Sequence, residues 1–170
     1  WQVYQDWYAQ IMSDHSKYAG MSLYGMLGAM TGTEPSKTIL LGISLGLLFI
    51  TVAQYRKWKE LWFRQLTLAA LLVWMVIFNH KAESPSYVIA MVGMALWFFS
   101  LPRKWPDIVL FLYAFTGVSL FFSDLVPWPI RDAYFYPYHL KALPCSILWI
   151  RILVDMWVVR KQAQASAVPA

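Results

Sequence analysis

Long apolar runs alternate with short polar loops along most of this chain. Five runs stand out, at 38–53, 61–78, 86–101, 108–126 and 143–159. Each is close to, or slightly shorter than, the ~20 residues that a helix needs to cross a ~30 Å hydrocarbon core. Shorter runs can still span a bilayer if flanking side chains reach the interface or the bilayer thins locally. The pattern therefore predicts an all-α fold, a multi-pass transmembrane helical bundle with about five spans.

The segment before the first run, residues 1–36, mixes aromatic and polar side chains. Tyr and Trp rings prefer the headgroup region of a bilayer, where the ring meets lipid and its polar atom meets water. We therefore expect an outward-facing segment of short interfacial helices here, then the transmembrane bundle at 37–160 and a cytoplasmic tail at 161–170. The chain opens at Trp1 without the features of a signal peptide, and we expect it to be a piece of a longer protein.

Basic residues are concentrated in alternate loops, which orients the predicted bundle. The loops at 54–60 and 102–106, and the tail from Arg160, hold dense Lys and Arg and belong on the cytoplasmic side by the positive-inside rule. The outward segments are then the opening one and those at 79–86 and 123–142, which together contain all three histidines and six of the nine acids. The net charge of +5 reflects this topology, so no nucleic-acid partner is expected.

The amino-acid composition further narrows the class of protein to which this chain can belong. The chain is 59% hydrophobic and only 14% charged, with a mean hydropathy of +0.48, which is more apolar than ordinary soluble domains. Its single cysteine, Cys145, excludes an intrachain disulfide and a cysteine-based metal site. The three histidines do not have the spacing of metal ligands, so we expect neither a metal nor a cofactor in this chain.

The loop between the second and third runs is the strongest candidate for chemistry. A histidine and a lysine at a helix end, here His80 and Lys81, form a compact cation that can hold a phosphate. Glu83 can orient His80 or accept a proton from a sugar hydroxyl. The alternative is that a short loop needs polar residues to turn in water, with Ser84 and Pro85 beginning the next helix. Charge alone does not separate the two interpretations.

Five further residues on the outward side are weaker candidates for substrate binding. Arg131, His139 and Lys141 lie in the proline- and aromatic-rich last outward loop and can approach a phosphate. An aromatic belt anchored at the headgroups is the alternative, and the composition of that loop favours it. Asp14 and His15 can form an acid–base pair or contact the acceptor, although adjacent residues of a helix need not face the same way.

Some residues inside the runs point to structure rather than chemistry. Arg151 and Asp155 stand four residues apart in the last run, and we expect them to pair on one helix face in a structural role. Small residues in two of the predicted spans indicate close helix packing instead of a binding site. They are Gly42, Ser44, Gly46 and Gly93.

Two stretches resemble a known family. Residues 73–99, VWMVIFNHKAESPSYVIAMVGMALWFF, and residues 4–27, YQDWYAQIMSDHSKYAGMSLYGML, are similar to parts of glycosyltransferase family 87, integral membrane enzymes of the GT-C superfamily. The resemblance implies transfer of a hexose, with mannose the first expectation, from a polyprenyl-phosphate donor to a glycan or glycolipid acceptor. The reaction would take place at the outer face of the cytoplasmic membrane. The implied partners are the lipid-linked sugar, the acceptor and membrane lipids.

The resemblance also implies roles for the loop residues. Enzymes of this superfamily use a carboxylate as the base on the acceptor hydroxyl, usually in a first outward loop near the N-terminus of the full protein. No such loop is recognisable in this chain, so we expect the main base to lie elsewhere, with Glu83 a weak candidate, and the chain alone to be inactive. His80 and Lys81 would then stabilise the phosphate leaving group.

A non-enzymatic membrane protein is the rival hypothesis, either a transporter or a lipid-carrier or scaffold subunit. A transporter is expected to have broken helices or polar residues near the middle of the membrane. Apart from Arg64 and the pair formed by Arg151 and Asp155, the predicted spans are nearly free of charge, which favours the enzyme.

Overall fold

The computed structural model describes residues 1–13, 20–120 and 125–158, with the backbone alone for residues 10–13. Within these ranges the chain forms helices and contains no β-strand, so the all-α prediction is confirmed. The long helices of the bundle are α3 (Lys37–Val52), α4 (Leu61–Ile77), α5 (Tyr87–Phe99), α6 (Trp105–Ser119) and α8 (Ala142–Val158). Other elements precede or join them: α1 (Gln2–Ser13), α2 (Leu23–Thr31), η1 (Tyr55–Lys59), η2 (Ser84–Ser86), α7 (Trp128–Ile130) and η3 (Arg131–Phe135).

Each of the five apolar runs corresponds to one bundle helix, although some ends differ. The largest difference is in α6, which begins at Trp105 and ends at Ser119 instead of running from 108 to 126. Its start is displaced because a proline is tolerated in the first turn of a helix, and the carboxylate of Asp107 accepts a hydrogen bond from the Lys104 N–H at 3.2 Å. Helix ends thus depend on capping residues as well as on the apolar pattern.

No helix in the described ranges is both long and apolar enough to cross a membrane. The prediction that the bundle helices are membrane spans therefore stays a prediction. So do the orientation of the bundle and the interfacial position of α1 and α2. Asp14, His15 and the tail predicted at 161–170 lie outside the described residues.

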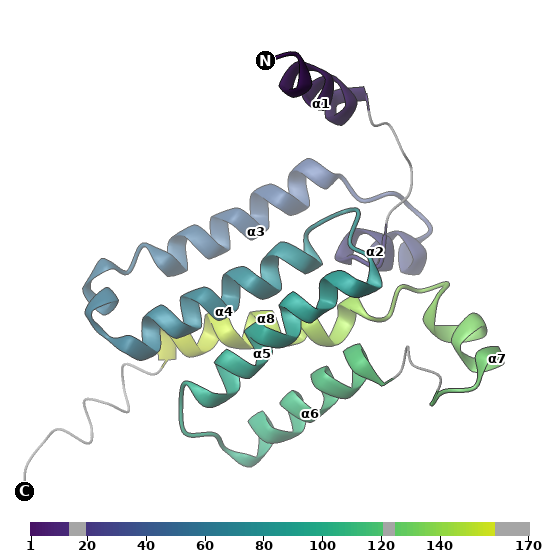
Figure 1. Cartoon of the computed structure of the whole chain (residues 1–170). Coiled ribbons are helices and arrows are strands. Elements are labelled where there is room, and N and C mark those ends of the chain that lie inside the picture. Colours follow the sequence, from purple (N-terminus) through teal and green to yellow (C-terminus); the bar gives the residue numbers. More distant parts are fainter. Residues whose placement is uncertain (14–19, 121–124, 159–170) are drawn as a thin grey trace, which may run out of the picture.

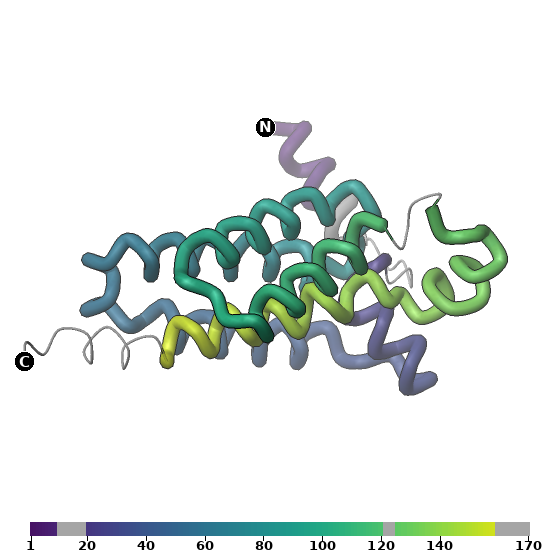
Figure 2. The backbone as a smooth tube through the Cα atoms, turned by 90° about the horizontal axis from the view of Figure 1, so that it is seen from below, coloured from purple at the N-terminus to yellow at the C-terminus, as the bar shows by residue number. Residues whose placement is uncertain are grey.

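Helix α4 lies at the centre of the bundle and packs against both α5 and α8, with α3 and α6 on the flanks (Figure 1; Figure 2). One face of α4 is fully buried, at Phe63, Leu66, Ala69, Ala70, Val73 and Ile77. A Cβ added at Gly93 of α5 would lie 2.9 Å from the carbonyl oxygen of Ala69 on α4. The close packing predicted at Gly93 is therefore confirmed, because any side chain there would separate the two helices.

The same prediction is wrong for two glycines of α3. A Cβ at Gly42 or Gly46 would have no neighbour within 4 Å among the described residues. The reason is that α3 lies on the flank of the bundle and contacts α4 through a different face, where Ser44 Oγ accepts a hydrogen bond from Trp74 Nε1 at 3.0 Å. Small residues permit close packing but do not decide which helix face is covered.

The bundle has two polar ends (Figure 1). One is formed by η1 and the link at 100–104, and we call it the basic end. The other is formed by the loop at 79–85, the link at 32–36 and residues 131–141, and we call it the histidine end. All the described candidate site residues lie at the histidine end.

Candidate functional site

The loop at 79–85 is held in place by the extended segment that precedes α2. The backbone N–H of Gly20 donates to the His80 carbonyl oxygen at 2.8 Å, and that of Met21 donates to the Ala82 carbonyl oxygen at 2.8 Å. The Tyr87 hydroxyl donates to the Met21 carbonyl oxygen. A Cβ at Gly20 would overlap the carbonyl oxygen of Ala82, so only glycine permits this approach. The loop conformation therefore depends on residues about sixty positions away in the sequence.

The three candidate residues of this loop differ in exposure. His80 is half-buried, whereas Lys81 and Glu83 are exposed. Burial lowers the pKa of His80, and the positive charge of Lys37 lowers it further. The prediction that Glu83 orients His80 is not supported, because no hydrogen bond or ion pair joins these two side chains in the described ranges. Lys37, at the start of α3, is the charged neighbour that affects His80.

Lys141 anchors the loop from the start of α8. Its side chain is buried, its Nζ donates to Ser84 Oγ at 2.5 Å, and the same atom lies 5.1 Å from the centroid of the Tyr87 ring. Burial lowers the pKa of Lys141. The sequence suggested that Lys141 approaches a phosphate directly. The structure places it beneath the loop, where it fixes the position of Ser84.

Arg131 is also buried, at 7% exposure. Its guanidinium carbon lies 5.1 Å from the centroid of the Trp128 ring, within the helical turns of α7 and η3. Arg131 does not line the cavity described below. It is therefore a packed residue of its own segment, in agreement with the structural alternative for this loop.

A cavity of about 430 Å³ opens at the histidine end, between α2, the start of α3 and the residues before α8. Its lining combines small apolar residues with five polar side chains. The small and apolar ones are Gly25, Gly28, Ala29, Gly32 and Pro35, and the polar ones are Tyr24, Thr33, Glu34, Lys37 and His139. His80 is not among the residues that line the cavity, and the 79–85 loop is connected to it through Lys37, whose charge lowers the pKa of His80.

The wall of the cavity follows from the spacing of small residues in α2. Positions 25, 28, 29 and 32 are three or four apart and thus share one helix face. Gly32 ends α2 in the left-handed region, with φ +68°, and its N–H donates to the Gly28 carbonyl oxygen at 2.9 Å. The chain then turns into α3, and the Tyr24 hydroxyl donates to the Lys37 carbonyl oxygen at 3.1 Å. This bond ties α2 to the start of α3.

His139 contributes an imidazole to the cavity from the opposite side. Among the described residues it is the one non-glycine residue with a positive φ, at 48°. Such a conformation costs free energy and persists where the surrounding structure enforces it. Burial lowers the pKa of His139. A strained, half-buried imidazole that lines a cavity is a candidate for ligand contact.

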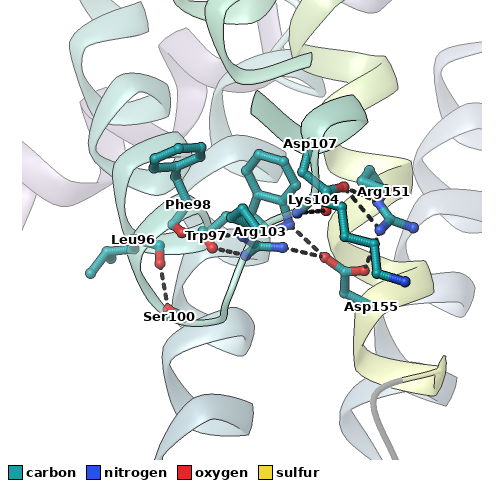
Figure 3. A network of polar contacts seen from close by, with 9 residues as sticks. All are labelled: Leu96, Trp97, Phe98, Ser100, Arg103, Lys104, Asp107, Arg151 and Asp155. Carbon is teal, nitrogen blue, oxygen red and sulfur yellow. Dashed lines mark hydrogen bonds and ion pairs between the residues drawn. The ribbon is translucent and has the colours of Figure 1, made fainter. Parts of the chain in front are cut away.

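The basic end contains a second polar cluster, shown in Figure 3, in which two arginines are paired with two aspartates. Asp155 accepts hydrogen bonds at 2.8 Å from both Trp97 Nε1 and Arg103 Nη1, and it forms an ion pair with Arg151 at 3.1 Å. Arg151 also pairs with Asp107 at 2.9 Å. The predicted pairing of Arg151 with Asp155 is confirmed, and the cluster joins α5, α6 and α8.

Sequence reasoning missed three residues of these two clusters. Arg103 was assigned only to membrane topology, and Asp107 and Lys37 were not considered. Asp107 has a weak local signal, because an acid in the first turn of a helix is favoured there. Lys37 and Arg103 have no local sequence signal, because the residues with which they interact lie in distant parts of the chain.

No protein-family model, curated protein or solved structure matches this chain. The resemblance to glycosyltransferase family 87 therefore stays an expectation. In the described ranges, no group of three or more His, Cys, Asp or Glu residues is close enough to hold a metal ion. The chemistry that the histidine end can perform thus rests on its cations, its imidazoles and its apolar cavity.

Proposed function

We propose that this chain is the C-terminal part of an integral membrane glycosyltransferase. The enzyme moves a hexose such as mannose from a polyprenyl-phosphate donor to a glycan or glycolipid acceptor at the outer face of the cytoplasmic membrane. The observation that carries the proposal is that Lys37 and His139 line a cavity with a largely apolar wall, at the end of the bundle that also carries His80. A lipid-linked sugar phosphate has the matching combination of an anionic head and an apolar chain.

The outer surface of the bundle supports a membrane environment. Large apolar side chains are exposed on the long helices, including Ile39 at 63%, Phe49 at 75% and Phe99 at 80%. Exposed apolar surface on this scale is typical of contact with lipid or with another protein. The 17-residue helices α4 and α8 rise ~25 Å at ~1.5 Å per residue, so as membrane spans they would require local thinning of the ~30 Å core.

The chemistry follows from the leaving group. As the glycosidic bond breaks, negative charge grows on the lipid phosphate, and fixed cations near that phosphate lower the barrier. Lys81 is exposed next to His80 in the loop, and Lys37 lines the cavity at the same end, so these three residues can stabilise the departing phosphate. We do not assign the base that takes the proton from the acceptor hydroxyl to a described residue, and the exposed Glu83 is only a weak candidate for it.

The test is sugar transfer by the full-length enzyme in proteoliposomes supplied with polyprenyl-phosphate mannose. Lys81→Ala should lower the transfer rate by ~10²–10³-fold, the usual effect of removing a fixed charge from such a site. Lys59→Ala is the matched control, because Lys59 is an exposed lysine at the opposite end of the bundle. Unchanged transfer by Lys81→Ala, with normal insertion of the protein, would exclude the phosphate role of this residue.

A lipid-carrier protein is the second candidate, because the apolar wall of the cavity suits a lipid chain without any chemistry. The same assay separates the two hypotheses. A carrier would bind the lipid-linked sugar and release it intact, whereas a transferase would produce a glycosylated acceptor and free lipid phosphate.

A further inference from the structure

We propose that the cavity between α2 and α3 is a proton-gated anion site: Lys37 holds a phosphodiester there, and His80 and His139 make its binding tighten as the pH falls. The inference deepens the proposed function and rests on it for the ligand, since a sugar linked to a lipid through one phosphate is a phosphodiester. It adds a form of regulation to that site.

The position of Lys37 is electrostatically unfavourable for the protein alone. Lys37 is the first residue of α3, where the helix dipole disfavours a positive charge, and the first turn of α3 contains no acid. His139 lines the same cavity, and the charge of Lys37 also acts on His80 of the 79–85 loop, whose pKa it lowers. A bound anion relieves these unfavourable terms at once, because it is attracted to the lysine, to the helix start and to each protonated imidazole.

The histidines supply the dependence on pH. In the free protein, burial lowers the pKa of His80 and of His139, and Lys37 lowers that of His80 further, so both are neutral near pH 7. A bound anion raises both pKa values, because it favours the charged imidazolium. Binding therefore takes up protons between the free and bound pKa values, and affinity rises as the pH falls through that window. Well above the window, both imidazoles stay neutral and affinity stops changing.

The other charged groups near the two imidazoles set limits on this effect. Glu34 lines the same cavity and opposes an anion. Lys81 and Glu83 flank His80 along the loop, and Lys141 follows His139 but is engaged with Ser84. Tyr24, from α2, is engaged with the Lys37 carbonyl. Histidine is the side chain whose charge ordinarily changes between about pH 5 and pH 8, so the imidazoles carry the pH dependence.

The apolar wall of the cavity favours a ligand that carries an alkyl chain. The face of α2 formed by Gly25, Gly28 and Ala29 offers a smooth surface beside the cation. A ligand with alkyl chains should therefore bind more tightly than its head alone. Didecyl phosphate and dimethyl phosphate make this comparison, because both are phosphodiesters that keep one negative charge throughout the pH range in which histidine titrates.

The experiment is equilibrium binding of each phosphodiester to the full-length protein in uncharged detergent micelles, at about pH 5.5 and about pH 7.5. Didecyl phosphate should bind about tenfold more tightly at the lower pH, as expected for a shift of about one pKa unit on binding. Lys37→Ala should weaken binding about tenfold or more at both pH values, the usual effect of losing a charge-assisted hydrogen bond. Lys59→Ala, at the basic end, should bind as the parent protein does.

Two further variants test whether His80 and His139 cause the pH dependence of binding. His139→Asn keeps a residue that tolerates a positive φ, and His80→Gln keeps a polar side chain, so both should fold. The double variant should bind at about pH 7.5 within twofold of the parent and lose most of the pH dependence. The inference is overturned if the parent shows no pH dependence, if the double variant keeps it, or if Lys37→Ala binds normally. If dimethyl phosphate bound as tightly as didecyl phosphate, the cavity would be excluded as the site that binds the alkyl chains.

These outcomes are separable from the fate of the proposed function. If binding behaves as described but the full-length protein transfers no sugar in proteoliposomes, the transferase proposal fails and the anion site stands. If transfer occurs but affinity for the phosphodiester does not depend on Lys37 or on pH, the enzyme stands and this inference fails.

Discussion

The charged side chains at the two ends of the bundle differ in how they are partnered. At the basic end, two cations face two anions: Arg103 and Arg151 are paired with Asp107 and Asp155, at 2.8–3.1 Å. Such a cluster is electrically balanced and offers little to an additional ion. Its three helices are held in one register because moving any of them would leave a buried charge without a partner.

At the histidine end, by contrast, the cationic and imidazole groups have few acidic neighbours. Lys37 and His139 line a cavity whose one carboxylate among the lining residues, Glu34, is exposed, and His80 lies in the loop at the same end. The end is held together by steric fit and backbone hydrogen bonds, such as those of Gly20 and Met21 to the 79–85 loop. The comparison teaches that a balanced cluster indicates a structural clamp, whereas an unbalanced one beside a cavity indicates a ligand site.

The largest effect that tests this contrast is expected at Asp155. Asp155→Asn removes the carboxylate that Arg103, Arg151 and Trp97 share, so it should lower the free energy of unfolding by about 3 kcal/mol. Thermal unfolding in detergent micelles measures the loss. Glu83→Gln, which changes an exposed carboxylate at the other end, should have little effect. Equal losses in the two variants would remove the distinction between the ends.

The next effect concerns the steric fit of the histidine end. Gly20→Ala should destabilise the protein by about 1–3 kcal/mol, because the new Cβ overlaps the Ala82 carbonyl oxygen and displaces the loop that carries His80. Gly42→Ala is the matched control, since open space surrounds Gly42 and alanine is the better helix former. The measurement is again thermal unfolding, with amide hydrogen exchange of the 79–85 loop to locate the change. A variant at Gly20 as stable as the parent would show that the fit is not tight.

The smallest effect has the opposite sign. Lys37→Gln should stabilise the ligand-free protein by about 0.3–1 kcal/mol, because it removes a positive charge from the start of α3. The same variant should bind didecyl phosphate less tightly, so stability and binding would change in opposite directions. Chemical denaturation without ligand provides the measurement. A loss of stability would mean that Lys37 has a structural role, like the arginines of the basic end.

Local features of the sequence determined the helical elements and one of the charge pairs. The apolar runs became helices because a helix satisfies its own backbone hydrogen bonds, and the four-residue spacing of Arg151 and Asp155 brought their side chains to 3.1 Å. Ends were less certain, as α6 shows, because capping by Asp107 shifted its start.

Only the tertiary structure decided the rest. It placed Lys141 beneath the loop, where it bonds to Ser84, and left Gly42 uncovered. It also brought Lys37 and His139, about a hundred residues apart, to one cavity. The physical reason is that contacts within a helix depend on spacing along the chain. Contacts between helices depend instead on which faces pack together, and several packings satisfy the same apolar pattern.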